Sequence, residues 1–172
     1  MRYFRHALYA PVFALLMALA LATITSRPLR AQDGVAVGDR APAAMLETLD
    51  GKPADLGRYL GKTPVVIEFW ATWCPLCKEL EPKLQAAATK YGARVKFVGV
   101  AVSVNQTPER VKLYAEKHKL PLEVLFDRKG AATDAYGVFA TSTVVVIDRG
   151  GTIVYIGQGG AQNIEAAIKR AL

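Results

Sequence analysis

The hydrophobic residues of the chain follow two different spacings, and each spacing predicts a different element. Continuous apolar runs rich in β-branched residues are typical of strands that are covered on both faces. Five such runs occur, at residues 64–70 (PVVIEFW), 94–102 (RVKFVGVAV), 122–126 (LEVLF), 143–148 (TVVVID) and 152–157 (TIVYIG). A shorter strand is predicted within 43–49, before a turn at Asp50 and Gly51 and a helical turn within 56–62.

Helical spacing appears between the apolar runs. Within residues 75–91 apolar side chains recur every three or four positions, and Gly92 follows as a signal for the end of a helix. A second helix is predicted from Pro108, with Thr107 as its N-cap, and Pro121 should stop it. Two shorter helices are predicted at 130–136 and 163–172.

The order of these elements predicts the fold class. A turn at residues 149–151 should join the last two apolar runs into a hairpin. Strands that alternate with helices, followed by a hairpin and a final helix, predict an α/β layer fold with a central mixed β-sheet flanked by helices. Residues 32–172 suffice for one such domain, and we expect residues 32–38 to form a short flexible lead-in.

The longest uncharged stretch lies near the N-terminus. Residues 7–25 carry no charge, two arginines precede them and two follow. Such a run lies between a signal-peptide core of about 7–15 residues and a spanning helix of about 20. We predict that residues 1–31 are either a signal peptide or an N-terminal membrane anchor. If the segment is not cleaved, residues 7–25 should provide the only membrane contact. Both interpretations place the domain outside the cytoplasm, in the bacterial periplasm or on the outer face of the inner membrane.

Composition and charge argue against a nucleic-acid partner. The chain has 172 residues, of which 52% are hydrophobic and 22% are charged, as in globular proteins. Its formal net charge of +7 includes four arginines within residues 1–31, where no acid occurs, so the remainder carries +3. The other basic residues are interleaved with acids, which is typical of an ordinary solvated surface.

The only two cysteines lie where the buried run 64–70 gives way to the helix 75–91. At a helix start, unpaired N–H groups and the macrodipole stabilise a thiolate, so the pKa of Cys74 should fall below about 8.5. Cys77 lies one turn further into the helix, where its thiol should be shielded and its pKa higher. This arrangement predicts an attacking thiol beside a resolving thiol.

Other uses of this cysteine pair have less support. A disulfide that closes so small a loop adds little chain-entropy stabilisation, which argues against a structural staple. A zinc site needs four ligands, and the only histidine after residue 31 is His118, expected to be a solvent-facing or capping residue. Attachment of c-type haem needs a histidine where Lys78 stands. We therefore expect no cofactor and no resident metal.

The segment VVIEFWATWCPLCKELEPKL at 65–84 resembles the active-site segment of the thioredoxin superfamily. With VGDRAP at 37–42, AYGVFATSTVVVIDRGGTIVY at 135–155 and the apolar N-terminal segment, it resembles the TlpA/ResA-type exported thiol-disulfide oxidoreductases. The resemblance implies a three-layer thioredoxin-like fold over 32–172 and a reversible Cys74–Cys77 disulfide. It also implies exchange with exported proteins that carry disulfides or dithiols, and it favours a reductant fed by a membrane electron donor. Some relatives serve cytochrome c maturation.

The resemblance assigns roles to residues around the cysteines. Trp73 should pack beside the disulfide, Pro75 should occupy the first helical turn, and the pair Pro75 and Leu76 should tune the reduction potential. Glu68 matches the buried acid of thioredoxins, and burial in an apolar strand should raise its pKa, so that it accepts the proton of Cys77. The alternative is an acid at the end of the strand that reaches water and pairs with a lysine, Lys78 or Lys96.

One position departs from the family. The superfamily has a cis-proline opposite the active site, preceded by threonine or a similar residue, and Thr141 and Ser142 align there. A cis bond before serine costs about 3 kcal/mol, so this bond should be trans. Ser142 would then leave room beside Cys74 for a different partner or for Cu(I), a metal that thiolates favour. A copper-binding or metal-delivery module that uses the same cysteine pair is therefore the alternative function.

Overall fold

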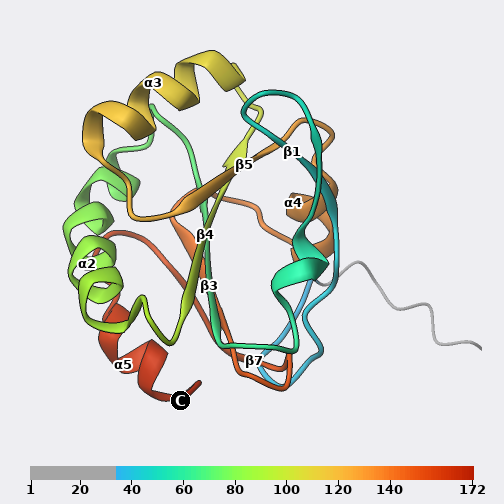
Figure 1. Ribbon diagram of the computed structural model, residues 1–172, viewed down its shortest axis with the longest axis vertical. Helices are drawn as coiled ribbons and strands as arrows, with labels where there is room; N and C mark the ends of the chain where they lie inside the picture. Colours follow the sequence, from blue (N-terminus) through green and yellow to red (C-terminus); the bar gives the residue numbers. More distant parts are fainter. Residues whose placement is uncertain (1–33) are drawn as a thin grey trace, which may run out of the picture. The chain divides into compact units, whose positions relative to one another are not determined.

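The computed structural model describes residues 34–172, so the predicted signal peptide or anchor at 1–31 lies outside the described residues. Seven strands form one sheet in the order β2-β1-β5-β4-β3-β6-β7 (Figure 1). The elements are β1 (Met45–Thr48), β2 (Pro53–Asp55), η1 (Leu56–Tyr59), β3 (Val65–Trp70), α2 (Pro75–Tyr91), β4 (Lys96–Val102), α3 (Pro108–His118), β5 (Glu123–Asp127), α4 (Ala131–Tyr136), β6 (Thr143–Ile147), β7 (Ile153–Gln158) and α5 (Ile164–Lys169). Within residues 34–172 no helix combines the length and apolar character needed to cross a bilayer.

The sheet is mixed, as predicted. Strand β4 runs parallel to both β3 and β5, whereas β1, β2, β6 and β7 pair with their neighbours in antiparallel fashion. The predicted hairpin is formed by β6 and β7. Thr107 caps α3 through its side chain, as expected, but α3 ends at His118 because Lys119 adopts a left-handed conformation with φ of 50°. The helix therefore stops before Pro121 is reached.

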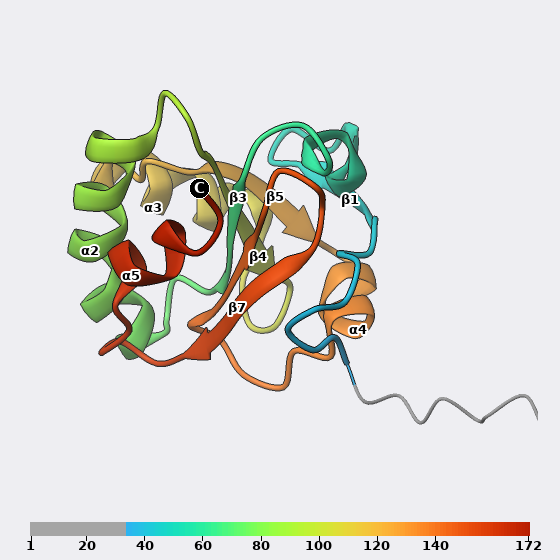
Figure 2. The ribbon, with the colours of Figure 1, turned by 90° about the horizontal axis from the view of Figure 1, so that it is seen from below.

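Helices cover both faces of the sheet and produce the predicted three layers. The helices α2, α3 and α5 lie on one face, and α4 lies with η1 on the other (Figure 2). On the α2 face, Val66 and Val144 pack against helix residues such as Leu84. On the α4 face, Ile67 and Phe69 belong to a separate apolar cluster. Strand β3 contributes to both clusters because successive side chains of a strand point to opposite faces.

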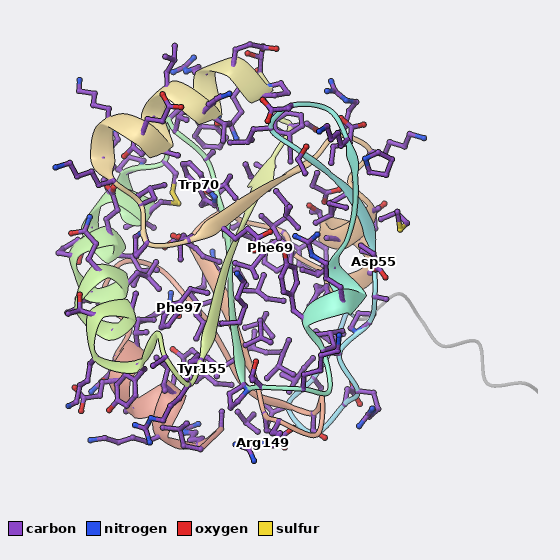
Figure 3. The ribbon with its side chains drawn as sticks, in the orientation of Figure 1. Asp55, Phe69, Trp70, Phe97, Arg149 and Tyr155 are labelled. Carbon is purple, nitrogen blue, oxygen red and sulfur yellow. A yellow bond between two sulfur atoms is a disulfide. The ribbon has the colours of Figure 1, made fainter. Side chains whose placement is uncertain are left out.

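Strand β3 is the central element that positions the cysteines. It lies between β4 and β6, and all six of its residues are buried. Trp70 lies toward α2 and α3, whereas Phe69 lies toward η1 and α4 (Figure 3). The chain leaves β3 after Trp70 and reaches the first turn of α2 within five residues, at Pro75.

The segment ahead of β1 is fixed to the domain. The Val35 N–H donates to Tyr136 O at 3.4 Å, and the Gly38 N–H donates to Ile153 O at 2.8 Å. Gly34 packs directly on Gly137, where a Cβ atom added to Gly34 would lie 2.6 Å from the Gly137 Cα atom. The flexible lead-in predicted for residues 32–38 is therefore wrong for 34–38, because backbone pairing to distant segments is not visible in local composition.

Candidate active site

The two cysteines form a disulfide at the start of α2, with their Cα atoms 5.3 Å apart. Cys74 is the N-cap, Pro75 occupies the first helical turn, and the Cys77 N–H donates to Cys74 Sγ at 3.1 Å. Burial does not distinguish the two residues, because Cys74 is 2% exposed and Cys77 is 5% exposed. The distinction lies in the helix geometry, since a backbone donor points at the sulfur of Cys74.

The loop after β4 is hydrogen-bonded to the segment that carries the cysteines. The Trp73 indole N–H donates to Val104 O at 2.8 Å, and the Thr72 N–H donates to Gln106 Oε1 at 2.9 Å. The side chains of Trp73, Leu76 and Val104 are exposed. The segments next to the cysteines therefore carry three exposed apolar side chains, while the packing of Trp73 against the disulfide itself stays a prediction.

Glu68 is buried in β3 on the α2 face and is only 4% exposed. Burial raises its pKa to about 8, and the nearby charge of Glu81 adds to this effect. Glu68 Oε1 has no hydrogen-bond partner. The alternative of a lysine-paired acid that reaches water is wrong, because Lys96 contacts Glu123 at 2.6 Å instead, and Glu68 has no ion pair within residues 34–172.

Ser142 lies at the same end of β3 as Cys74. Residues 34–172 contain no cis peptide bond, so the bond between Thr141 and Ser142 is trans, as predicted. Ser142 has a φ of 62°, a left-handed conformation that is costly for residues with a Cβ atom. Its N–H donates to Phe69 O at 2.8 Å, a bond that proline cannot make.

The carbonyl of Ser142 is also bound within the protein. It accepts from the Gly159 N–H and from Gln162 Nε2, each at 3.0 Å. Gln162 in turn accepts from Tyr155 Oη at 3.1 Å. The side chain of Ser142 is completely buried, and its Oγ has no partner. A set of internal hydrogen bonds therefore holds this loop where the family uses a cis-proline.

Three polar residues on α2 and α3 complete the site. Glu81 Oε2 accepts from Tyr114 Oη at 3.2 Å, and Glu81 Oε1 lies 3.1 Å from His118 Nδ1. The rings of Tyr114 and His118 are stacked with centroids 3.9 Å apart. His118 reaches solvent as expected, with a side chain that is 33% exposed, but its ring also contacts Tyr114 and Glu81, which the sequence did not predict.

Sequence reasoning missed Glu81, Tyr114, Gln106 and Gln162 as parts of this site. Glu81 has a usable signal, because it lies four residues after Cys77 and side chains at this spacing share a helix face. The other three have no such signal, since distant segments bring them to the site. The arrangement joins a disulfide at a helix start to a buried acid, which suits thiol-disulfide exchange coupled to proton transfer.

Comparison with known proteins agrees with this chemistry. Residues 37–156 match the AhpC/TSA family. The chain belongs to the AhpC/TSA family. This family member is 32% identical over 145 residues to the thiol-disulfide oxidoreductase ResA of Geobacillus thermodenitrificans, covering 83% of this chain and 80% of that protein. It is also 32% identical over 121 residues to the thioredoxin-like protein YneN of Bacillus subtilis, covering 70% of each chain.

Solved structures of similar fold also include thiol-disulfide oxidoreductases. A thioredoxin family thiol:disulfide interchange protein from Chlorobium tepidum superposes with a TM-score of 0.63 at 26% identity, covering 80% of this chain and 98% of that one. These relatives confirm the thioredoxin-like fold and the class of enzyme predicted from the sequence, a thiol-disulfide oxidoreductase.

Proposed function

We propose that this protein is an exported dithiol reductant that exchanges its Cys74–Cys77 disulfide with partner proteins outside the cytoplasm. The observation that carries the proposal is the disulfide at the start of α2, with a backbone N–H directed at Cys74 Sγ and the buried Glu68 on the adjacent face of β3. The export segment predicted at residues 1–31 supports the location, and the resemblance to the TlpA/ResA-type oxidoreductases favours a reductant.

The reaction begins in the reduced protein at Cys74. Its thiolate attacks one sulfur of a partner disulfide, the partner S–S bond breaks, and one partner cysteine leaves as a thiolate. Cys77 then gives its proton to Glu68, in the fraction of molecules in which this carboxyl group is ionised, and attacks Cys74 Sγ in the mixed disulfide. The Cys74–Cys77 bond forms, the intermolecular bond breaks, and the second partner cysteine leaves. Two electrons have passed to the partner, so a further dithiol donor, in the membrane, must restore the reduced state.

The surface around the disulfide supports a protein partner. The exposed side chains of Trp73, Leu76 and Val104 provide apolar area beside the cysteines. Large aromatic and apolar groups of this kind contribute much of the affinity in protein recognition. We therefore expect partners that present a cysteine within an apolar, accessible segment.

Trapping of mixed disulfides tests this function. The Cys77→Ala protein should accumulate covalent adducts with exported proteins, because the resolving thiol is absent, whereas Cys74→Ala should form far fewer. The double variant serves as the control for nonspecific association. The copper alternative predicts a different result: no adducts with Cys77→Ala, and equal loss of Cu(I) binding in both single variants. That result would contradict the proposal.

A further inference from the structure

We propose that Glu81 and His118 form the route by which the proton that Glu68 takes from Cys77 reaches solvent, with Tyr114 as the residue that positions Glu81. The inference rests on the proposed function. It concerns a step that thiol exchange requires, since a buried acid that has accepted a proton must release it before the next cycle.

Few groups around Glu68 could accept its proton. Its neighbours in register on the adjoining strands are Gly99 and Val144, neither of which carries a polar side chain. A Cβ atom added to Gly99 would lie 2.9 Å from Trp70 Nε1, so the indole covers this side. Trp70 Nε1 itself has no hydrogen-bond partner. The side of Glu68 that remains faces the helices α2 and α3.

Glu81 lies on that side. It follows Cys77 by four residues on α2, so the two side chains share one face of the helix. Its charge adds to the effect of burial in raising the pKa of Glu68, as expected for two carboxyl groups on the same side of β3. Glu81 is also less buried, with a side chain that is 15% exposed. It is therefore an intermediate position between Glu68 and water.

Helix α3 supplies the remaining two groups. Trp70 packs on Tyr114 with ring centroids 5.6 Å apart, and Tyr114 donates to Glu81 Oε2. Burial, followed by the charges of Glu81 and Glu68, raises the pKa of Tyr114 to about 12, so Tyr114 keeps its proton and orients the carboxylate. Glu81 Oε1 is buried and lacks a hydrogen bond, and His118 Nδ1 is the group beside it.

His118 provides the connection to solvent. Its side chain is 33% exposed, twice as much as that of Glu81, and its ring is fixed by the stack on Tyr114. The imidazole can accept a proton at one nitrogen and release one at the other. The titratable groups that interact with Glu81 from other elements are Glu68 on β3 and the pair Tyr114 and His118 on α3. On α2 itself Lys78 lies three residues earlier, but no lysine or arginine of residues 34–172 forms an ion pair with Glu81.

The proton balance is simple. During resolution, Cys77 transfers one proton to Glu68 as its sulfur bonds to Cys74 Sγ. The proton then passes to the Glu81 carboxylate, from there to His118, and from His118 to water or buffer. No electron moves along this route, and each carboxyl group and the imidazole return to their starting state.

A two-phase reaction with 5,5′-dithiobis(2-nitrobenzoate) tests the route. Attack by Cys74 releases the first chromophoric thiolate, and resolution by Cys77 releases the second. His118→Gln should leave the first phase unchanged and slow the second by about tenfold in weakly buffered solution. Added imidazole should restore the second phase, because it replaces the missing proton carrier. Glu81→Gln should slow the second phase as well, but imidazole should restore it less.

Matched controls make the result decisive. Lys117→Gln and Glu116→Gln alter exposed neighbours on α3 and should affect neither phase. If His118→Gln leaves the second phase unchanged, or slows it without rescue by imidazole, the proton route is wrong and His118 has at most a structural role. Absence of a second phase in the unmodified protein would instead contradict the proposed function, so the two failures are distinguishable.

Discussion

Glu68 and Phe69 are adjacent in β3, but Phe69 lies in an apolar cluster and Glu68 lies among buried polar groups that lack partners. Phe69 is completely buried on the α4 face and packs against Tyr136 with ring centroids 5.5 Å apart. Glu68 is buried on the α2 face with one carboxylate oxygen that has no partner. Trp70 Nε1 and Ser142 Oγ, toward the cysteine end of β3, are also buried without partners.

The α4 face mainly stabilises the fold, whereas the α2 face near Cys74 supplies groups for the reaction. The α4 face gains free energy from close apolar packing, where every atom has neighbours. The α2 face near Cys74 carries polar groups whose burial costs free energy unless they are paired. A buried acid with a raised pKa is costly for folding but useful beside a thiol that must lose its proton. Substitutions on the two faces should therefore have opposite effects.

The largest effect on stability is expected from Phe69→Ala. The lost side chain leaves a cavity in a fully packed core, so the free energy of unfolding should fall by about 3–5 kcal/mol. The reduction potential of the cysteine pair should not change, because the cavity lies on the opposite face. Urea unfolding and equilibration against thiol buffers measure the two quantities. A clear shift in the reduction potential of Phe69→Ala would remove the distinction between the faces.

Glu68→Gln should act in the opposite direction. The folded protein holds the Glu68 proton up to about pH 8, whereas the unfolded chain releases it near 4.5, so stability should fall as the pH rises between these values. The substitution should abolish this slope and raise the free energy of unfolding at pH 8 by about 2–3 kcal/mol, after allowing for an unpaired amide. It should also slow resolution by Cys77.

Unfolding in urea at several pH values, with the exposed Glu79→Gln as control, measures this effect. An unchanged pH slope in Glu68→Gln, or an unchanged resolution rate between pH 6 and 9, would show that Glu68 does not carry the proton.

Gln162→Ala should have a smaller effect, confined to the Ser142 loop. The change removes the amide that holds the carbonyls of Ser142 and Gly159, and it leaves Tyr155 Oη without its acceptor. We expect a loss of about 1–2 kcal/mol in stability and weaker binding of protein partners, with little change in reactivity toward small disulfides. Gln158→Ala, at an exposed site nearby, is the control. An equal loss of activity toward protein partners and toward small disulfides would indicate a general loss of folding instead.

Ser142→Gly should have the smallest effect. Glycine adopts the positive φ of this position without steric cost, but it also loses more backbone entropy on folding. The difference should be a gain of about 0.5 kcal/mol, measurable as a small rise in the melting temperature. Ser142→Ala removes the unpaired hydroxyl but keeps the steric cost, so it separates the two contributions. A marked loss of stability in Ser142→Gly would mean that the hydroxyl is bound in solution.

The features that local pattern determines could be predicted from the sequence. The strand β3, the helix α2 that begins after Cys74, and the burial of Glu68 all follow from a run of apolar residues and a proline in the first turn. The trans bond before Ser142 follows from the chemistry of the residue itself.

Features that depend on distant segments could not be predicted. The Val35 N–H donates to the carbonyl of Tyr136, 101 residues further along the chain. The side chain of Gln162 donates to the carbonyl of Ser142, 20 residues earlier. The end of α3 was also set by the conformation of Lys119 ahead of any proline signal. His118 reaches Glu81 only because α2 and α3 pack on the same face of the sheet, which no spacing within α3 reveals.

The reduction potential of the Cys74–Cys77 couple, measured by equilibrium against defined thiol buffers, tests the central claim most directly. The account predicts a value well below about −200 mV, as expected for a dithiol reductant that needs an electron supply. A value near about −120 mV, typical of a strong oxidant, would contradict it and identify the protein as a donor of disulfides.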